Sequence, residues 1–409
     1  MIILADDLSG AQECIAAASW LPVGDIGESV PAAAAVMLDE GRSLPDVEII
    51  AADINSRCLS STEAINKTKL TLDLLENTDP KKSNHQVFFK FDSILRGNIA
   101  AQLGAASDSL GPVVFCPAVP ALNRVVRNGV VQVNGVPLHE TGLWHLESEF
   151  APESVSEIFT DLDPTTVSLD ELRSGELASK LKSVSPSTQV VVCDAETDED
   201  LDVLAAAIRE AGLAAAGASG LCAALARVTP PASSELLTES IAKLDSATTT
   251  DDDSGDVGAL FIIGTASNQA KAQVKRLSEE GVPVVAWHPG FAEELPDGDC
   301  VVTVSGPIRS EASAGIDKGL AELVADNHRG RDLFLTGGQT ARSILDALTI
   351  AELRPLAQPE FGTVVSRTPD GRFVVTRPGS FGSTDNLIFS FRTLKHLRAL
   401  YAPNERTSS

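Results

Sequence analysis

Two adjacent aspartates, Asp6 and Asp7, follow the apolar stretch MIILA at the start of the chain. A carboxylate in this position can accept a proton from a hydroxyl group or bind a cation. It can also cap a following helix, because an aspartate side chain accepts hydrogen bonds from the first helical turn. Two neighbouring carboxylates repel each other unless a cation, a helix N-terminus or a ligand compensates. The pair therefore indicates a functional site, and a helix cap remains the alternative for either residue.

A second polar cluster, DSILRGN at residues 92–98, follows the apolar stretch VFFKF. Its arginine, Arg96, can bind a carboxylate through two parallel hydrogen bonds, which a lysine does less well. Its glycine, Gly97, allows a ligand or a neighbouring loop to come close. The cluster is typical of a binding loop for an anionic ligand, and a solvated, salt-bridged turn is the alternative.

Two further segments of the first half carry polar groups after apolar stretches. PAVPALNR ends at Arg124 and adds positive charge to an acidic protein, where it could close over an anionic substrate. The sequence VQVNGVPL that follows predicts a hairpin, because Asn134-Gly135 is a strong signal for a two-residue turn. The turn GASGL at residues 217–221 fits an anion site or close packing equally well.

Three glycine-rich loops in the second half are typical of phosphate-binding junctions. They are GTAS at residues 264–267, GGQT at residues 337–340 and PGSFG at residues 378–382. Backbone N–H groups and hydroxyls with little steric bulk can surround a phosphate in such loops. None is a Walker A loop or a GxGxxG dinucleotide fingerprint. One loop alone is a weak signal, whereas two in one domain favour nucleotide or phosphate binding.

The elements that must position these residues are predicted by an alternation of apolar stretches and helix-like segments. Residues 61–77 begin with a capping sequence and predict a helix. The alternation predicts an α/β fold with mostly parallel sheets flanked by helices. Ligands of such folds bind beyond the carboxyl ends of the strands. The predicted buried strands of the first half are MIILA, VEIIAAD, VFFKF, VVFCPA and VVVCDA.

The length of 409 residues predicts two domains. Residues 229–256 are rich in proline at one end and aspartate at the other, and they predict a linker. The predicted domains are therefore residues 1–228 and 257–409.

Composition excludes several classes of function. The net charge of −25 argues against nucleic acid and anionic membranes as partners. No apolar stretch approaches the roughly eighteen residues of a membrane span, and no signal peptide precedes MIILADD, so we expect a cytoplasmic protein. The six cysteines are scattered without a CxxC pair, which predicts buried free thiols rather than a zinc site or disulfides.

The ordered motifs ADDLSGA, DSILRGN, PAVPALNR, GASGL, GTAS, GGQTA and RPGSFG resemble those of the four-carbon acid sugar kinases. The resemblance covers nearly the whole chain, and the shared order is far more specific than any single motif. It implies a sugar-acid-binding N-terminal domain and a nucleotide-binding C-terminal domain, with the active site in the cleft between them. Residues that depart from the family pattern include Ile94, Asn123, Gln339, Arg377 and Ser380.

The resemblance implies that ATP phosphorylates a hydroxyl, most simply O4, of a sugar acid such as threonate, erythronate or a 3-oxo-tetronate. Asp7 or Asp6 would then be the catalytic base, with Asp92 in reserve, and Mg²⁺ would bridge the phosphates through unassigned ligands. The implied substrate-binding residues are Asp92, Ser93, Arg96, Gly97, Asn98 and Arg124. The implied ATP-binding residues are Gly264, Thr265, Ser267, Gly337, Gly338, Gln339, Thr340, Gly379, Ser380 and Gly382.

Two other classes of function remain as alternatives. One is a sugar-acid- and nucleotide-binding protein that has lost transfer, which the altered GGQT and RPGSFG loops motivate. The other is a nicotinamide-dependent dehydrogenase, against which the missing GxGxxG argues. The sequence leaves open which acid is bound, which aspartate is the base, and the oligomeric state, a homodimer included.

Overall fold

The structure is a computed structural model, and it describes the chain with several gaps. The described residues are 1–21, 23–24, 33–38, 44–78, 86–145, 147, 150–162, 164–229, 258–264, 267–291, 294–305, 313–379 and 382–401. They form two compact units, the first made of Met1–Trp20 and Ala35–Ala232, the second of Leu21–Ala34 and Ser233–Ser409. Most of the predicted linker, as well as Thr265 and Ser380, lies outside the described residues, so the linker at 229–256 stays a prediction.

The first unit is built on a parallel sheet of short, buried strands. Strands β3, β1, β4, β11, β5, β10 and β9 pair in parallel in this order, and β2 lies beside β3. Both faces are covered, because every residue of β1 is buried. The strands are β1 (Ile2–Ala5), β2 (Ala33–Met37), β3 (Ile49–Asp53), β4 (Val87–Lys90), β5 (Val113–Cys116), β9 (Thr165–Val167), β10 (Val190–Cys193) and β11 (Ala214–Gly217).

Helices and a small hairpin sheet complete the first unit. The predicted helix at residues 61–77 is confirmed as α2 (Ser61–Thr78). The predicted hairpin is also confirmed, because Val133 pairs with Val136 across Asn134-Gly135, which have φ of 52° and 80°. The remaining elements are α1 (Leu8–Ala18), α3 (Ile99–Leu110), α4 (Leu169–Leu172), α5 (Leu177–Lys182), α6 (Asp198–Ala211), α7 (Ser219–Val228), β6 (Arg124–Arg127), β7 (Val130–Val133) and β8 (Val136–Pro137).

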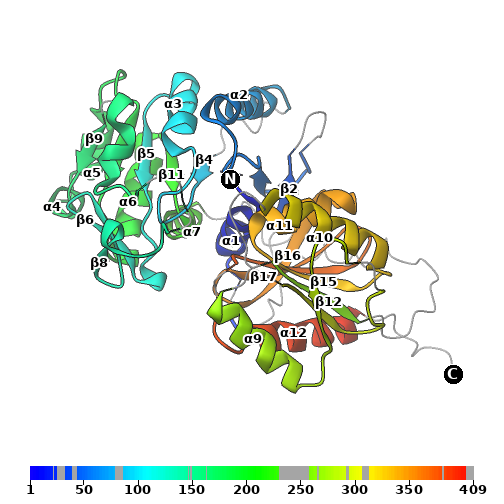
Figure 1. Ribbon diagram of the computed structural model, residues 1–409. Coiled ribbons are helices and arrows are strands. Elements are labelled where there is room, and N and C mark those ends of the chain that lie inside the picture. Colours follow the sequence, from blue (N-terminus) through cyan, green and yellow to red (C-terminus); the bar gives the residue numbers. More distant parts are fainter. Residues whose placement is uncertain are drawn as a thin grey trace. The chain divides into compact units, whose positions relative to one another are not determined.

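The second unit has a mixed sheet with the strand order β13-β14-β12-β15-β18-β17-β16. The pairs from β13 to β18 are parallel, whereas β17 is antiparallel to both of its neighbours. In Figure 1, α10 and α11 cover one face of this sheet and α9 and α12 the other. The elements are β12 (Ala259–Ile263), β13 (Val284–Trp287), β14 (Cys300–Val304), β15 (Asp332–Thr336), β16 (Glu352–Glu360), β17 (Thr363–Arg367), β18 (Phe373–Arg377), α9 (Asn268–Glu279), α10 (Ser313–Asn327), α11 (Gly338–Ala347) and α12 (Asn386–Tyr401).

This architecture confirms the predicted α/β class with mostly parallel sheets flanked by helices. The antiparallel strands β16 and β17 were not predicted. All six cysteines are free, and five of them are buried, whereas Cys58 is exposed. None of the helices in the described residues is long and apolar enough to cross a membrane.

The chain reverses its direction across each sheet at one pair of neighbouring strands. In the first unit it leaves β1 toward β2 on one side and leaves β4 through α3 toward β5 on the other. In the second unit it leaves β12 through α9 toward β13 and leaves β15 through α11 toward β16. Ligands of α/β sheets bind at such reversal points, outside the carboxyl ends of the two strands. The predicted motifs ADDLSGA and DSILRGN follow β1 and β4, and GTAS and GGQT follow β12 and β15.

Candidate active site

The aspartate pair lies at the carboxyl end of β1, where one arginine, Arg57, contacts both carboxylates. Its Nε and Nη2 donate to Oδ2 and Oδ1 of Asp6 at 2.8 and 2.7 Å, and its Nη1 donates to Oδ2 of Asp7 at 2.6 Å. Asp7 is also the N-cap of α1, because its Oδ1 accepts from the N–H of Gly10 at 2.8 Å. The helix-cap alternative is therefore correct for Asp7, and the cation that compensates the pair is Arg57.

Arg57 was not predicted from the sequence. It lies in NSRCLS, just after β3, and β3 pairs with β1, so its position after a neighbouring strand was the available signal. The backbone N–H groups of Ser56 and Arg57 donate to the carbonyl oxygen of Asp6 at 2.9 and 3.1 Å, which fixes this segment beside β1. Gly97 leaves room for the arginine, since a Cβ there would lie 3.2 Å from Arg57 Cγ. Its φ of 95° also favours glycine.

A second buried ion pair lies behind the aspartates. Lys90, the last residue of β4, approaches Glu13 of α1 with an Nζ–Oε2 distance of 3.2 Å. The Ser219 hydroxyl donates to Oε1 of Glu13 at 2.6 Å. Burial alone would lower the pKa of Lys90, but the carboxylate of Glu13 raises it above its usual value. The GASGL turn thus supplies Ser219, while its glycines serve close packing, since a Cβ at Gly217 would lie 1.9 Å from a backbone oxygen.

The DSILRGN loop brings a third carboxylate next to a more exposed arginine. The Nε of Arg96 donates to Oδ2 of Asp92 at 2.5 Å. Although burial alone would raise the pKa of Asp92, Arg96 and Arg57 lower it, so this carboxylate is ionised. The Arg96 side chain is 35% exposed, against 19% for that of Arg57, and can reach a ligand. Arg124 donates through Nη1 to the Ser93 hydroxyl, which brings two predicted substrate-binding residues together.

Asn98, another predicted substrate-binding residue, is engaged by the protein itself. Its Nδ2 donates to the carbonyl oxygens of Ser56 and Leu59 at 3.1 and 2.8 Å, and its Oδ1 accepts from Ser61. These bonds tie the loop after β4 to the segment that carries Arg57. The contacts that the structure shows for Asn98 position this loop.

In the second unit, the loops after β12 and β15 meet. The N–H of Gly264 donates to the Thr336 hydroxyl at 3.0 Å, and a Cβ at Gly264 would lie 2.9 Å from Oγ1 of Thr340. Thr340 in turn donates to Oδ1 of Asp317 at 2.6 Å. Gly337 has a φ of 83° and precedes α11, whose first turn receives no side-chain cap. The N–H groups at this helix start, from Gly338 and Gln339 onward, can therefore bind an anion.

Ser267 and Gly382, two other predicted ATP-binding residues, have structural partners. Ser267 caps α9 by accepting from the N–H of Ala270 at 3.1 Å. Gly382 has a φ of 87°, and its carbonyl oxygen accepts from Nε2 of Gln269 at 3.0 Å. Gly379 is partly buried just after β18. Arg377 of the same loop region is buried and donates to Gln273, and its burial lowers its pKa to about 10.

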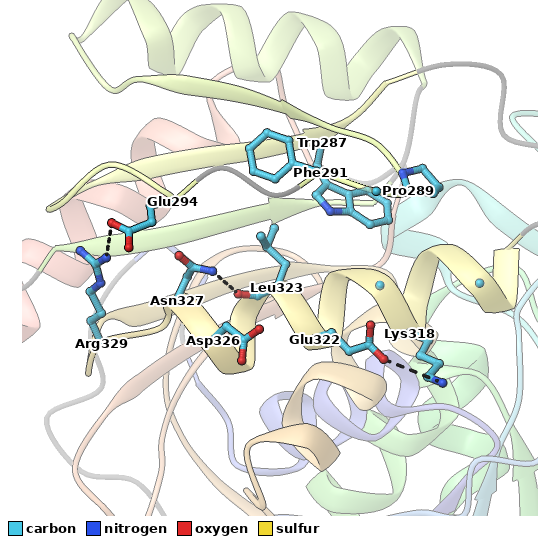
Figure 2. A pocket seen from close by; sticks show the side chains of 13 residues that line it. Trp287, Pro289, Phe291, Glu294, Lys318, Glu322, Leu323, Asp326, Asn327 and Arg329 are labelled. Atoms are coloured by element: carbon cyan, nitrogen blue, oxygen red, sulfur yellow. Dashed lines mark hydrogen bonds and ion pairs between the residues drawn. The ribbon is translucent and has the colours of Figure 1, made fainter.

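A pocket of about 640 Å³ lies elsewhere in the second unit, between α10 and the segment after β13. Figure 2 shows Trp287 and Phe291 on one side and the charged residues of α10 on the other. No residue predicted to bind substrate or ATP lines it. Its lining residues are Trp287, Pro289, Gly290, Phe291, Glu294, Gly315, Lys318, Gly319, Glu322, Leu323, Asp326, Asn327 and Arg329.

Two family models match the chain. That of a sugar-binding N-terminal domain matches residues 1–225, more than half of the chain, and that of a nucleotide-binding C-terminal domain matches residues 299–387. The chain belongs to the four-carbon acid sugar kinase family. The candidate residues after β1 and β4 lie within the first match, and GGQT lies within the second.

Two named members of this family are similar along most of their length, and a third along about half of it. A D-threonate kinase of Cupriavidus necator is 28% identical over 434 aligned positions, which cover 97% of this chain and 99% of the relative. A 3-oxo-tetronate kinase of Methylobacterium radiotolerans is 27% identical, with 93% and 96% covered. A D-erythronate kinase of Heliobacterium modesticaldum is 25% identical over an alignment that covers 50% of this chain and 47% of the relative.

Solved structures show the same fold. A protein from Salmonella typhimurium described as a putative tRNA synthase superposes with a TM-score of 0.72 at 18% identity, covering 96% of this chain and 99% of that one. A Haemophilus influenzae protein superposes with a TM-score of 0.67 at 19% identity, covering 97% and 100%. Both therefore share this architecture at low sequence identity.

Proposed function

We propose that this protein transfers the γ-phosphoryl group of ATP to a hydroxyl of a four-carbon sugar acid, with O4 as the acceptor atom. The acid is threonate, erythronate or a 3-oxo-tetronate, as the names of the relatives suggest. The observation that carries the proposal is the reversal point of the first unit. It places the buried carboxylates of Asp6 and Asp7 after β1 and the partly exposed Arg96 after the neighbouring strand β4. This arrangement suits a substrate with a hydroxyl at one end and a carboxylate at the other.

In this reaction the acceptor hydroxyl loses its proton to an aspartate as its oxygen forms the new bond to phosphorus. The bond from the γ-phosphorus to the β,γ-bridging oxygen breaks, and ADP leaves. Asp7 suits the role of base better than Asp6, since its side chain is 9% exposed and that of Asp6 is 0% exposed. Asp6 also has both carboxylate oxygens bound by Arg57.

The phosphates of ATP would lie at the reversal point of the second unit. The N–H groups at the start of α11 suit the phosphates, because a helix N-terminus can bind an anion. The loop around Gly264 suits them because this residue has no side chain, and a side chain there would meet Thr340. Mg²⁺, when bound, neutralises the charge of the phosphates. No group of three potential metal ligands occurs among the described residues, and none is needed, because Mg²⁺ commonly takes phosphate oxygens, water and one or two carboxylates. The γ-phosphate must reach the acceptor, so the predicted cleft between the domains remains part of this proposal.

The test is a screen of the D and L forms of threonate and erythronate, and of 3-oxo-tetronates, with Mg-ATP. ADP release that depends on one acid, with a phosphorylated product seen by ³¹P NMR, supports the proposal. A thermal shift with an acid but no ADP release from any of them would favour the sugar-acid-binding alternative. A change in NADH absorbance with an acid would instead indicate a dehydrogenase.

A first prediction concerns the substrate carboxylate. We expect Arg96→Met to raise the KM for the sugar acid roughly 10- to 100-fold, because a hydrogen bond to a charged group contributes about 1.5–3 kcal/mol. The KM for ATP should stay within a factor of about two, since Arg96 lies in the first unit and the proposed phosphate site lies in the second. Initial rates at varied concentrations of each substrate measure both constants.

Arg227→Met is the matched control, because Arg227 forms an exposed ion pair with Asp202 on α6. An unchanged KM for the acid in Arg96→Met would show that another residue binds the carboxylate.

A further inference from the structure

The charge of the aspartate pair depends on Arg57. Among the described residues, Arg57 is the cation in direct ion contact with Asp6 and Asp7, through three hydrogen bonds of 2.6–2.8 Å. We propose that Arg57 is a positioning residue that compensates the negative charge of the aspartate pair and thereby keeps a shared proton off the pair at neutral pH. The value of this for catalysis rests on the proposed kinase function, whereas the ionisation is a property of the free protein.

Arg57 is held in place by groups on two neighbouring segments, the end of β1 and the loop after β4. Its own N–H donates to the Asp6 carbonyl oxygen at 3.1 Å, its Cγ packs beside Gly97, and the neighbouring carbonyl of Ser56 accepts from Asn98. Its Nη1 and Nη2 bind different aspartates, so one planar group sets the relative orientation of both carboxylates. A lysine has no comparable fork of donors.

The other charged groups around the pair are matched with one another. Lys90 pairs with Glu13 at 3.2 Å, and Arg96 pairs with Asp92 at 2.5 Å and faces Glu147 at 3.7 Å. Arg124 donates to Ser93, and Cys58, next to Arg57, contributes a thiol that is neutral near pH 7. Among the described residues, Lys90 and Arg96 could therefore replace the charge of Arg57 only by giving up a carboxylate partner of their own.

Two adjacent carboxylates without a cation share a proton up to a higher pH than either would alone. Burial raises the pKa of Asp6, and the guanidinium of Arg57 opposes this effect. Without Arg57, burial and the repulsion from Asp7 would act together on the pair. The shared proton would then prevent the pair from accepting another, and a rise in pH would remove it.

The experiment compares wild type with Arg57→Gln, Arg57→Lys and the control Arg227→Gln, whose arginine pairs with Asp202 at the surface of the same unit. Potentiometric titration of the ligand-free full-length chain should show that Arg57→Gln releases about one proton more than wild type as the pH rises from 5 to 8. Arg57→Lys and Arg227→Gln should show no such excess. Circular dichroism verifies that each variant is folded.

The pH dependence of kcat provides the second readout. We expect the acid limb of Arg57→Gln to move up by about one pH unit or more, so that kcat falls about tenfold or more at pH values on the wild-type acid limb and recovers as the pH rises. Arg57→Lys should keep the wild-type limb. The double variant Arg57→Gln/Asp6→Asn has only one of the two carboxylates, so the pair can no longer share a proton. Its acid limb should therefore move back toward that of wild type. It also serves if Arg57→Gln alone does not fold.

The outcomes separate this inference from the proposed function. An active wild type with no excess proton in Arg57→Gln and an unmoved acid limb would overturn the role of Arg57. If Arg57→Gln raised the KM for the acid but did not move the acid limb, that result would also overturn the role of Arg57. It would indicate that Arg57 binds the substrate. An excess proton in a protein that transfers no phosphate would support the role of Arg57 and reject the kinase proposal.

Discussion

Asp7→Asn is expected to lower kcat by about 10²- to 10⁴-fold, because a positioned general base contributes a factor of this size. The substitution isolates the charge, since asparagine is also a good N-cap and its oxygen can still accept from the N–H of Gly10. The dissociation constants of ATP and of the sugar acid should change little. Steady-state kinetics and isothermal titration calorimetry measure the two effects separately.

Asp202→Asn is the control for this change, because Asp202 is a half-exposed aspartate that also pairs with an arginine. Its kcat should equal that of wild type. If Asp7→Asn kept kcat within about tenfold of wild type, Asp7 would not be the base. Asp92, which lies at the neighbouring strand end, would then be the next residue to test.

Lys90→Met is expected to produce the largest loss of stability, about 3–5 kcal/mol in the free energy of unfolding. The Lys90 and Glu13 side chains are 5% and 10% exposed, so removal of the lysine leaves a buried, uncompensated carboxylate. The adjacent Asp6 and Asp7 would add to the repulsion. Equilibrium unfolding in urea, followed by circular dichroism, measures the change.

The double variant Lys90→Met/Glu13→Gln tests the cause of that loss. It removes both charges, and the Ser219 hydroxyl can still donate to the glutamine oxygen, so we expect it to recover much of the stability. Lys182→Met breaks an exposed ion pair with Glu210 and should cost about 1 kcal/mol or less. A double variant no more stable than Lys90→Met would mean that packing of the lysine stem, rather than charge, matters here.

The apolar stretches and the motifs that follow them were sufficient to predict the α/β class and to place the candidate residues at strand ends. MIILA and VFFKF are short, mostly apolar runs, and such runs form strands buried on both faces of a parallel sheet. The residues directly after them, Asp6, Asp7 and Asp92, are therefore at the carboxyl edge in any arrangement of those strands. Local sequence determines this much because a strand and the turn after it are adjacent in the chain.

Local sequence could not predict which strands become neighbours, and the partners across the site depend on that. Arg57 reaches Asp6 because β3 pairs with β1, although the two residues lie 51 positions apart in the chain. Ser219 reaches Glu13 from 206 positions away because α7 and α1 come together. The loops carrying Gly264 and Thr340 meet for the same reason, since β12 pairs with β15.

By itself, then, the sequence determined the fold class, the order of the motifs and the carboxylates that the proposed chemistry needs. Only the tertiary structure decided how the charge of those carboxylates is balanced. Asp7 proved to be a helix cap and half of a pair held by Arg57, and Lys90 proved to be committed to Glu13. The physical reason is that strand and helix signals act over a few residues, whereas burial and charge compensation are set by groups that only folding brings within about 3 Å of one another.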